Sequence, residues 1–336
     1  MSSLGVEPWR ARQLSDWIYK KGVSEFDHMS NLSTSLRKYL SEVSSIGLPI
    51  LVESVTSHRD PVTKALLAFE DGQEVEAVLM RFNYGNSVCL SVQAGCRMAC
   101  TFCASGLDGL QRNLSTSEML GQVLLMRSFL PPQQGLRISH IVLMGVGEPL
   151  DNLDNVLKLL QIANAPWGLG ISYRNMTLST CGILDGITKL GQAKIPINLA
   201  VSLHAADDEL RKQLMPGAHS YELRDLLVAI KGYTASSGRR VTIEYGLIAG
   251  VNDSEKQALK LATLLRGLLV HVNLIPINPV IEADGRVLSS RSPAQQVISF
   301  MQILNEKGIV VSLRREMGSD IIAACGQLRA SRRNSA

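Results

Sequence analysis

Between residues 86 and 313, short apolar segments alternate with helical patterns, and this alternation limits the possible folds more than any other feature of the chain. The segments are rich in β-branched residues and read SVCLSVQ, ISHIVLMGVG, NMTLST, INLAVSL, VTIEYGL and HVNLIPIN. Repeated strand-helix alternation predicts a parallel sheet, because a helix must carry the chain back to the start of each new strand. Six such units predict an α/β fold, namely a partial (β/α)6 barrel of TIM-like architecture.

The unusual motifs of this region all follow predicted strands. They are the cysteine cluster at 96–103, GEP at 147–149, STCG at 179–182, SLHA at 202–205 and PIN at 276–278. In such barrels the chemistry lies on loops at the carboxyl ends of the strands. We therefore expect these motifs to converge on one site.

Further regions flank the predicted barrel. Residues 1–48 have helical spacing of apolar residues and predict a small helical accessory domain. Residues 49–85 contain three strand patterns separated by turn residues and predict a short linking β extension. The barrel then spans 86–313, and a C-terminal segment with a basic tail spans 314–336.

Composition narrows the class of protein. The chain has 336 residues, of which 46% are apolar, enough for one large core and a small accessory domain. No apolar run approaches the roughly 18 residues that cross a bilayer, so we expect a cytoplasmic protein with no membrane partner. The formal net charge of +4 permits an RNA partner without requiring one.

Cys96, Cys100 and Cys103 are the candidate metal ligands, and they are half of the six cysteines in the chain. In a reducing compartment such a cluster favours metal or redox chemistry over a disulfide framework. Three small core residues are one alternative, because free cysteine packs well. A structural zinc site is another, but no second cysteine pair or histidine pair lies nearby to complete it. Three thiolates can also hold an iron–sulfur cluster that leaves one iron open to a non-protein ligand.

The spacing Cys-x3-Cys-x2-Cys, with Phe102 before the last cysteine, resembles that of the radical S-adenosylmethionine (SAM) enzymes. More narrowly, the chain resembles the RlmN/Cfr family of RNA adenine methyltransferases over almost its whole length. The segments that carry this resemblance are YGNSVCLSVQAGCRMACTFCAS, GVGEPLDN, SLHA, RRVTIEYGLIAGVND, HVNLIPIN, DIIAACGQLRA and, in the accessory domain, WRARQLSDWIYKKGVSEFDHMSNLS. The resemblance implies a radical SAM barrel with one [4Fe-4S] cluster, held by the three cysteines and SAM, and two SAM molecules per turnover.

The resemblance also implies a reaction and its partners. The RlmN branch of the family methylates carbon 2 of an adenine in 23S rRNA, at the peptidyl transferase centre, and in the anticodon loop of tRNA. A one-electron donor such as flavodoxin or ferredoxin is implied, and we expect a monomer. Two alternatives stay open: Cfr-type methylation of carbon 8 of the same rRNA adenine, and a non-enzymatic metal-bearing RNA-binding protein.

Carbon 2 of adenine is not nucleophilic, so its methylation requires a radical route. By resemblance, Cys325 accepts a methyl group from one SAM molecule. A radical derived from the second SAM then removes a hydrogen from that methyl group, and the resulting carbon radical adds to the adenine. Cys89 would release the methylated base by forming a transient disulfide with Cys325. Glu76 matches the family's proposed proton acceptor.

The SAM contacts implied by the resemblance lie in the motifs that follow the strands: Gly147, Glu148, Ser179, Ser202, Leu203, His204 and Asn278. Glycine permits close backbone approach, and the polar side chains offer donors or acceptors to an amino acid and a ribose. Two positions depart from the family pattern. Val146 stands where methionine is common, and Cys181 stands where serine is usual. Cys181 is either a conservative replacement of serine or a spare thiol near the cluster.

Contacts with RNA have the weakest signal in the sequence. Candidates for phosphate contacts are Arg97, Arg112, Arg239, Arg240, Arg314 and Arg315. The accessory domain adds a basic face with an aromatic residue, formed by Trp9, Arg10, Arg12, Lys20 and Lys21. Because arginine is usually a solvated surface residue, we expect only some of these to touch RNA. The target adenine must leave its stack, so recognition of folded RNA with one splayed base is expected.

Overall fold

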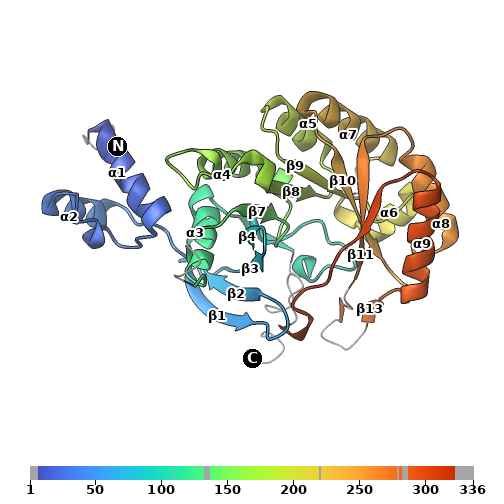
Figure 1. Cartoon of the computed structure of the whole chain (residues 1–336), viewed down its shortest axis with the longest axis horizontal. Coiled ribbons are helices and arrows are strands. Elements are labelled where there is room, and N and C mark those ends of the chain that lie inside the picture. Colours follow the sequence, from blue (N-terminus) through green and yellow to red (C-terminus); the bar gives the residue numbers. More distant parts are fainter. Residues whose placement is uncertain are drawn as a thin grey trace.

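The computed structural model describes residues 7–107, 109–131, 137–218, 221–277, 280–281 and 287–321. Its centre is one ten-stranded sheet, shown in Figure 1, with the spatial order β1 (Ile50–Thr56), β2 (Val62–Ala68), β3 (Glu74–Phe82), β4 (Gly85–Cys89), β7 (His140–Leu143), β8 (Met176–Thr180), β9 (Asn198–Ser202), β10 (Val241–Leu247), β11 (Val270–Pro276) and β14 (Val311–Leu313). From β4 to β14 all neighbouring strands are parallel. The predicted α/β partial barrel is therefore confirmed.

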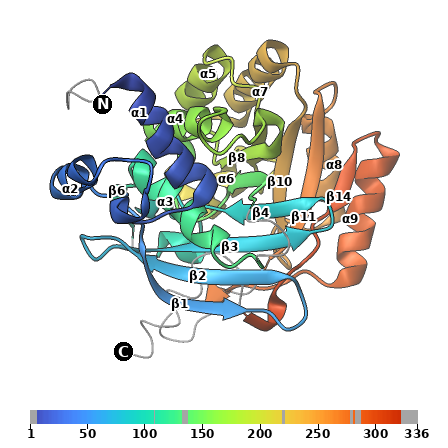
Figure 2. The ribbon, with the colours of Figure 1, turned by 60° about the vertical axis from the view of Figure 1, so that its left-hand side comes forward.

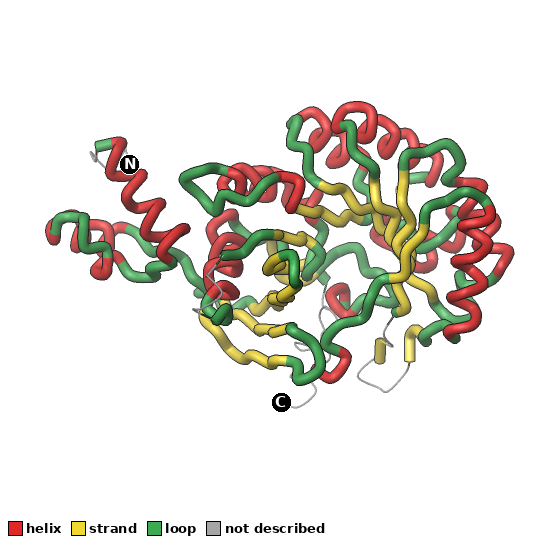
Figure 3. The backbone as a smooth tube through the Cα atoms, viewed as in Figure 1, coloured by secondary structure: helices red, strands yellow, loops and turns green. Residues whose placement is uncertain are grey.

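Helices cover the outer face of this curved sheet (Figure 3). They are α3 (Thr116–Arg127), α4 (Leu153–Asn164), α5 (Leu184–Gln192), α7 (Leu223–Ser237), α8 (Glu255–Leu264) and α9 (Ala294–Glu306), while the shorter α6 (Asp208–Leu214) follows β9. Two small antiparallel pairs complete the strands: β5 (Gln93–Gly95) with β6 (Leu110–Asn113), and β12 (Val280–Ile281) with β13 (Val287–Ser289).

All six predicted barrel strands form, and β14 adds a seventh parallel strand beside β11. Its three residues, Val311–Leu313, are too few to show a period in the sequence. Its pairing with β11 depends on α9, which returns the chain to the edge of the sheet. Single-turn 3₁₀ segments lie between these elements, at η3 (Phe26–His28), η4 (Ala104–Gly106), η6 (Pro149–Asn152), η7 (Tyr173–Asn175), η8 (Pro216–Ala218) and η9 (Ser319–Ile321).

Alternation along each strand gives the sheet two different faces. In β10, Ile243 and Tyr245 are fully buried in the core beneath the helices. The side chain of Glu244, between them, points to the opposite face of the sheet. In the same way Glu76 of β3 and Cys89 of β4 lie on the face away from the helices. We call this face the inner face.

The linking β extension is continuous with the barrel wall. β1, β2 and β3 are antiparallel to one another, and β3 pairs antiparallel with β4 through Val78 and Cys89. The three strand patterns predicted between residues 49 and 85 thus belong to the same sheet as the barrel strands. This continuity brings side chains of β2 and β3 beside the first parallel strand.

The N-terminal helices α1 (Pro8–Ser15) and α2 (Thr34–Val43), with the π-helical turn η2 (Asp16–Lys21), lie beside α3 (Figure 2). Gly22 ends η2 in the left-handed conformation, which glycine adopts without steric cost. Arg127 at the end of α3 donates hydrogen bonds to the carbonyl oxygens of Tyr19, at 2.5 Å, and Ile18. These contacts join the accessory helices to the barrel.

Across the described ranges, no helix is both long enough and apolar enough to cross a bilayer.

Candidate active site

The cysteine loop, residues 96–103, packs against the last residue of α6 and the chain that follows it. The Thr101 N–H donates to the Leu214 carbonyl at 3.0 Å, and the Gly217 N–H donates to the Met98 carbonyl at 2.9 Å. A Cβ at position 217 would lie 2.5 Å from the Cα of Met98, so only glycine allows the two backbones to approach this closely. Backbone contacts between distant segments therefore position the loop.

The loop brings the thiols of Cys96, Cys100 and Cys103 close enough to interact electrostatically, and it places them beside Cys181 in the loop after β8. Burial raises the pKa of Cys96 to about 12, and the neighbouring thiols act in the same direction. A hydrogen bond between the thiols of Cys100 and Cys181 lowers the pKa of Cys100 and raises that of Cys181. All three predicted ligands thus lie together, with a fourth thiol next to them.

The chemistry of these thiols fits an iron–sulfur cluster. Among the described residues, no three His, Cys, Asp or Glu side chains are grouped closely enough to hold one ion. In a [4Fe-4S] cluster each thiolate binds a different iron, so its ligands are spaced more widely than those of a zinc ion. Buried thiols also need nearby positive charge to ionise, and cluster irons supply it. The three cysteines therefore fit the predicted cluster.

Phe102 connects the cysteine loop to the motif after β9. Its ring meets the His204 ring edge to face, with centroids 4.6 Å apart. Nδ1 of His204 accepts a hydrogen bond from the Gly246 N–H at 2.8 Å, and burial lowers the pKa of His204 to about 3. The ring is therefore neutral and carries its proton on Nε2. His204 also has a φ of 56°, and Asn252 donates to its carbonyl oxygen at 2.8 Å.

Glu148 is the buried acid of the GEP motif. Its carboxylate accepts hydrogen bonds from the Cys181 N–H at 2.6 Å, the Thr180 hydroxyl at 2.7 Å and the Leu150 N–H at 3.0 Å. Burial raises the pKa of Glu148, while these donors act in the opposite direction. Its own N–H donates to Gln93 Oε1 at 2.8 Å. This one side chain joins the loop after β7 to the loop after β8.

The other predicted SAM contacts that the structure describes lie along the same edge of the sheet. Gly147 has a φ of 108°, and a Cβ there would lie 2.6 Å from Cβ of Gln93, so the position accepts only glycine. Ser179 lies near the end of β8, Ser202 is the last residue of β9, and Leu203 follows it directly. Asn278 lies outside the described residues, and its role stays a prediction.

Glu76 and Cys89 lie on neighbouring strands of the inner face. Val78 of β3 is paired with Cys89 of β4, and Glu76 precedes Val78 by two positions. Both side chains are buried, at 3% and 8% exposure. Lys64 of β2 completes the group, because its Nζ lies 3.0 Å from Glu76 Oε2.

The segment after β14 runs to the turn between β1 and β2 (Figure 1). Asp320 accepts hydrogen bonds from the Ser57 hydroxyl at 2.6 Å and from the His58 N–H at 2.9 Å. In return, the Gly318 N–H donates to Asp60 Oδ2 at 2.8 Å. We call this reciprocal pair of carboxylate contacts the C-terminal clasp.

Next to the clasp, Ile321 is buried in one apolar cluster with Cys89 and Val78, and Met317 packs against that cluster. The described part of the C-terminal segment therefore ends on the inner face beside Cys89. Cys325 lies outside the described residues, so its pairing with Cys89 stays a prediction.

The arginines predicted to contact phosphates lie in different environments. Three are already paired with carboxylates, namely Arg97, Arg112 and Arg315. Arg239 and Arg240 precede β10, at the edge of the sheet opposite the cysteine loop. Arg314 and Arg315 are exposed in the segment after β14. Of the six, this last pair combines exposure with proximity to the C-terminal clasp.

In the accessory domain, cations and tryptophans contact one another. Cζ of Arg10 lies 4.2 Å from the centre of the Trp9 ring, and Nζ of Lys21 lies 3.4 Å from that of Trp17. Trp9 is half exposed. Aromatic surface beside positive charge suits RNA, and it is equally the surface of an ordinary amphipathic helix.

Two residues that hold the loops of the site in place, Arg211 and Thr180, were not predicted from the sequence. Arg211 of α6 is buried and donates to the carbonyl oxygens of Cys181, at 2.5 Å, and Ala218. The Thr180 hydroxyl donates a hydrogen bond to Glu148. Because Thr180 lies within the STCG motif, its position in the sequence could have indicated this role. No sequence pattern indicates a role for Arg211, because an arginine in a short polar helix is usually a solvated surface residue.

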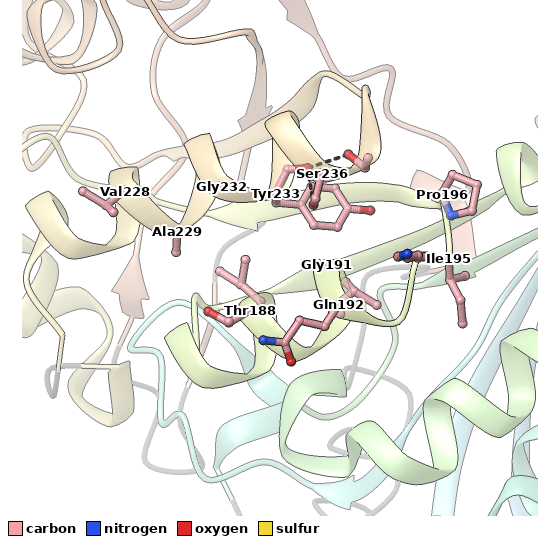
Figure 4. A pocket seen from close by; sticks show the side chains of 14 residues that line it. Thr188, Gly191, Gln192, Ile195, Pro196, Val228, Ala229, Gly232, Tyr233 and Ser236 are labelled. Carbon is pink, nitrogen blue, oxygen red and sulfur yellow. Dashed lines mark hydrogen bonds between the residues drawn. The ribbon is translucent and has the colours of Figure 1, made fainter.

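A separate cavity of about 750 Å³ lies on the outer side of the barrel, between α5 and α7 (Figure 4). Its lining includes Gly191, Ile195, Val228 and Tyr233 and is mainly apolar. Ile195 precedes β9, so the cavity lies toward the amino ends of the strands. It is therefore distinct from the site formed by the cysteine loop.

Comparisons with known proteins agree with this geometry. The family model of the ribosomal RNA large subunit methyltransferase N-terminal domain matches residues 1–46, and that of the radical SAM superfamily matches residues 90–262. A crystal structure of a radical SAM methyltransferase from Sphaerobacter thermophilus is 39% identical, with a TM-score of 0.91, and the match covers 97% of this chain and 94% of that chain.

Curated relatives match along almost the whole chain. A probable dual-specificity RNA methyltransferase RlmN of Desulforamulus reducens is 48% identical over 98% of this chain and 92% of the relative. A protein of the same name from Clostridium perfringens strain 13 is 47% identical over 98% of this chain and 93% of the relative. Radical SAM membership implies a [4Fe-4S] cluster and SAM as cofactors. The chain belongs to the RlmN family of radical SAM RNA methyltransferases.

Proposed function

We propose that this enzyme methylates carbon 2 of an adenine in 23S rRNA, at the peptidyl transferase centre, and in the anticodon loop of tRNA. In this proposal Cys325 carries the methyl group, Cys89 releases the product and Glu76 accepts the proton from carbon 2. One cluster, held by the three loop cysteines and SAM, supplies when bound the electron that cleaves SAM.

The observation that carries the proposal is that Ile321 belongs to the same buried apolar cluster as Cys89 on the inner face. Cys325 follows Ile321 by four residues, and four residues of extended chain span at most about 14 Å. The methyl carrier is thus tethered within short reach of the proposed releasing thiol. Glu76 lies on the same face, one strand away from Cys89.

The release step needs these two thiols to meet. The thiolate of Cys89 attacks the sulfur of Cys325, so a sulfur–sulfur bond forms and the sulfur–methylene bond breaks. The electron pair of the broken bond passes to the methylene carbon, which takes a proton and becomes the methyl group on the adenine. Burial of Cys89 keeps its thiol away from competing oxidants until the adduct forms.

The motifs at the carboxyl edge of the sheet would bind SAM. Glu148, with Gly147, would contact the amino group, while Ser179, the 202–204 stretch and Asn278 would contact the rest of the molecule. Two SAM molecules are used per turnover, and a flavodoxin or ferredoxin supplies electrons. Residues 1–48 act as an RNA-binding accessory domain, and the enzyme acts as a monomer.

Mass spectrometry of adenines from 23S rRNA and tRNA tests the proposal. RNA from cells that lack the gene is compared with RNA from cells that express the protein or its Cys325→Ala variant. We expect 2-methyladenosine in both RNAs only with the unaltered protein. Appearance of 8-methyladenosine instead would establish the Cfr-type reaction, and absence of any gene-dependent methyladenosine would overturn the proposal.

A further inference from the structure

Lys64 is the fully buried cation of the inner face. Its side chain is 0% exposed, and its Nζ lies 3.0 Å from Oε2 of Glu76, which is 3% exposed. The two residues come from neighbouring strands, in which Lys64 is paired with Val78 and Leu66 with Glu76. The ion pair is therefore a diagonal contact across β2 and β3.

A buried ion pair of this kind is costly to form. Both charges lose their hydration, and replacing such a pair with apolar side chains often leaves stability unchanged or improved. The rest of β2 reads VT-ALLA around the lysine and is buried almost throughout. The 3.0 Å contact between Nζ and Oε2 fixes where the Glu76 carboxylate lies. The pair thus orients Glu76 more than it stabilises the core.

Few other charges on this face compete for Glu76. Among the described residues of β1 to β4 and β7, the remaining titratable side chains on the inner face are Glu53, Glu74, Cys89 and His140. Glu53 is solvent-exposed. The segment after β14 adds Arg315, Glu316 and Asp320, which contact Asp60, Arg291 and Ser57 respectively.

We propose that Lys64 is a positioning residue that holds Glu76 as an oriented carboxylate, so that Glu76 can accept the proton from carbon 2 of the RNA adenine. This inference rests on the proposed function. In the step concerned, the carbon–hydrogen bond at carbon 2 breaks, its electron pair stays in the purine ring, and the proton moves to an oxygen of Glu76. The unpaired electron that radical addition leaves in the ring would return to the one-electron-oxidised iron–sulfur cluster, so that a closed-shell adduct remains. Without the ammonium group, Oε2 of Glu76 loses the contact that fixes its position, and the carboxylate is no longer oriented for proton transfer.

The test measures release of deuterium from RNA labelled at carbon 2 of the target adenine. For Lys64→Met we expect methylation of Cys325 at the normal rate, while deuterium release at pH 7 falls at least about tenfold. Lys64→Arg should restore release at pH 7. Lys231→Met, at an exposed position of α7, is the matched control and should match the unaltered protein.

A double variant separates positioning from a structural role. Lys64→Met combined with Glu76→Gln has no buried charge, so it folds even if Lys64→Met alone does not. Its deuterium release should equal that of Glu76→Gln alone, because Lys64 acts only through Glu76. A further loss in the double variant, or an equal loss of Cys325 methylation in Lys64→Met, would overturn the inference.

The same assay shows whether the proposed function has failed instead. Normal deuterium release by Glu76→Gln removes Glu76 from its role whatever Lys64 does. Deuterium release from carbon 8 rather than carbon 2 overturns the choice of methylation site.

Discussion

The Glu148 carboxylate accepts a hydrogen bond from the backbone N–H of Cys181, at 2.6 Å, rather than from its side chain. The contact that fixes the loop after β8 is therefore independent of whether residue 181 is cysteine or serine. The thiol itself turns toward Cys100. This arrangement explains why the loop accommodates the departure from serine.

Cys181→Ser and Cys181→Ala should therefore bind iron normally and methylate RNA within about twofold of the unaltered protein. In both variants the backbone N–H of residue 181 can still donate its hydrogen bond to Glu148. Iron analysis and a methylation assay check this. Loss of the cluster in both variants would show that the thiol of Cys181 is a ligand.

Glu148→Gln should destabilise the protein. The carboxylate accepts hydrogen bonds from Cys181, Thr180 and Leu150. The glutamine amide group cannot accept a hydrogen bond through its nitrogen, so at least one of these three donors is left without an acceptor in a buried position. We expect the free energy of unfolding to fall by about 1–3 kcal/mol, with weaker SAM binding. Urea denaturation and anaerobic calorimetry measure the two effects. Unchanged values for both would contradict the role given to Glu148.

Replacing any one of Cys96, Cys100 or Cys103 with alanine should abolish iron binding and SAM cleavage, because two thiolates cannot hold the cluster. An anaerobic preparation of the unaltered protein should be brown, with about four irons and matching sulfide per chain. A colourless protein that contains zinc would instead favour the non-enzymatic RNA-binding alternative.

Gly217→Ala should disturb the cysteine loop. The added Cβ would lie 2.5 Å from Met98 Cα and 2.6 Å from the Arg97 carbonyl oxygen, and both are backbone atoms that cannot turn away. We expect a loss of about 1–3 kcal/mol in the free energy of unfolding and poorer cluster retention. Gly232→Ala is the matched control, since nothing lies within 4 Å of its Cβ position in α7, and it should stabilise the protein slightly.

The C-terminal clasp should depend on pH. The hydrogen bond from Ser57 lowers the pKa of Asp320 below its ordinary value of 3.8. The contact therefore adds stability above pH 3.8 and loses it only as the pH falls further, through the folded-state pKa. Nuclear magnetic resonance of the Asp320 side-chain carboxyl carbon should show a titration midpoint below pH 3.8. A shift centred above pH 5 would contradict the clasp.

Cys89→Ala should trap the RNA. The variant keeps Cys325 and so should still methylate it and attack the adenine, but it cannot form the releasing disulfide. A denaturing gel should show protein covalently bound to RNA through Cys325, whereas Cys325→Ala should show none. Efficient turnover by Cys89→Ala without a crosslink would contradict disulfide release.

The sequence by itself determined the barrel and its motif positions. Strand patterns such as VTIEYGL alternate with period two, and the motifs follow them directly, so both depend on local order along the chain. The cysteine spacing is local as well. The three thiols therefore met as the sequence predicted, on a loop after β5.

Tertiary structure alone decided which distant side chains became neighbours. Lys64 meets Glu76 because β2 pairs with β3 in one register, and a slip of one residue would turn either side chain to the opposite face. Cys181 meets Cys100 because parallel strands bring separate loops to one edge of the sheet. Asp320 reaches Ser57 only because α9 and β14 return the chain to the barrel. No periodicity encodes such contacts, since each depends on packing between segments far apart in sequence.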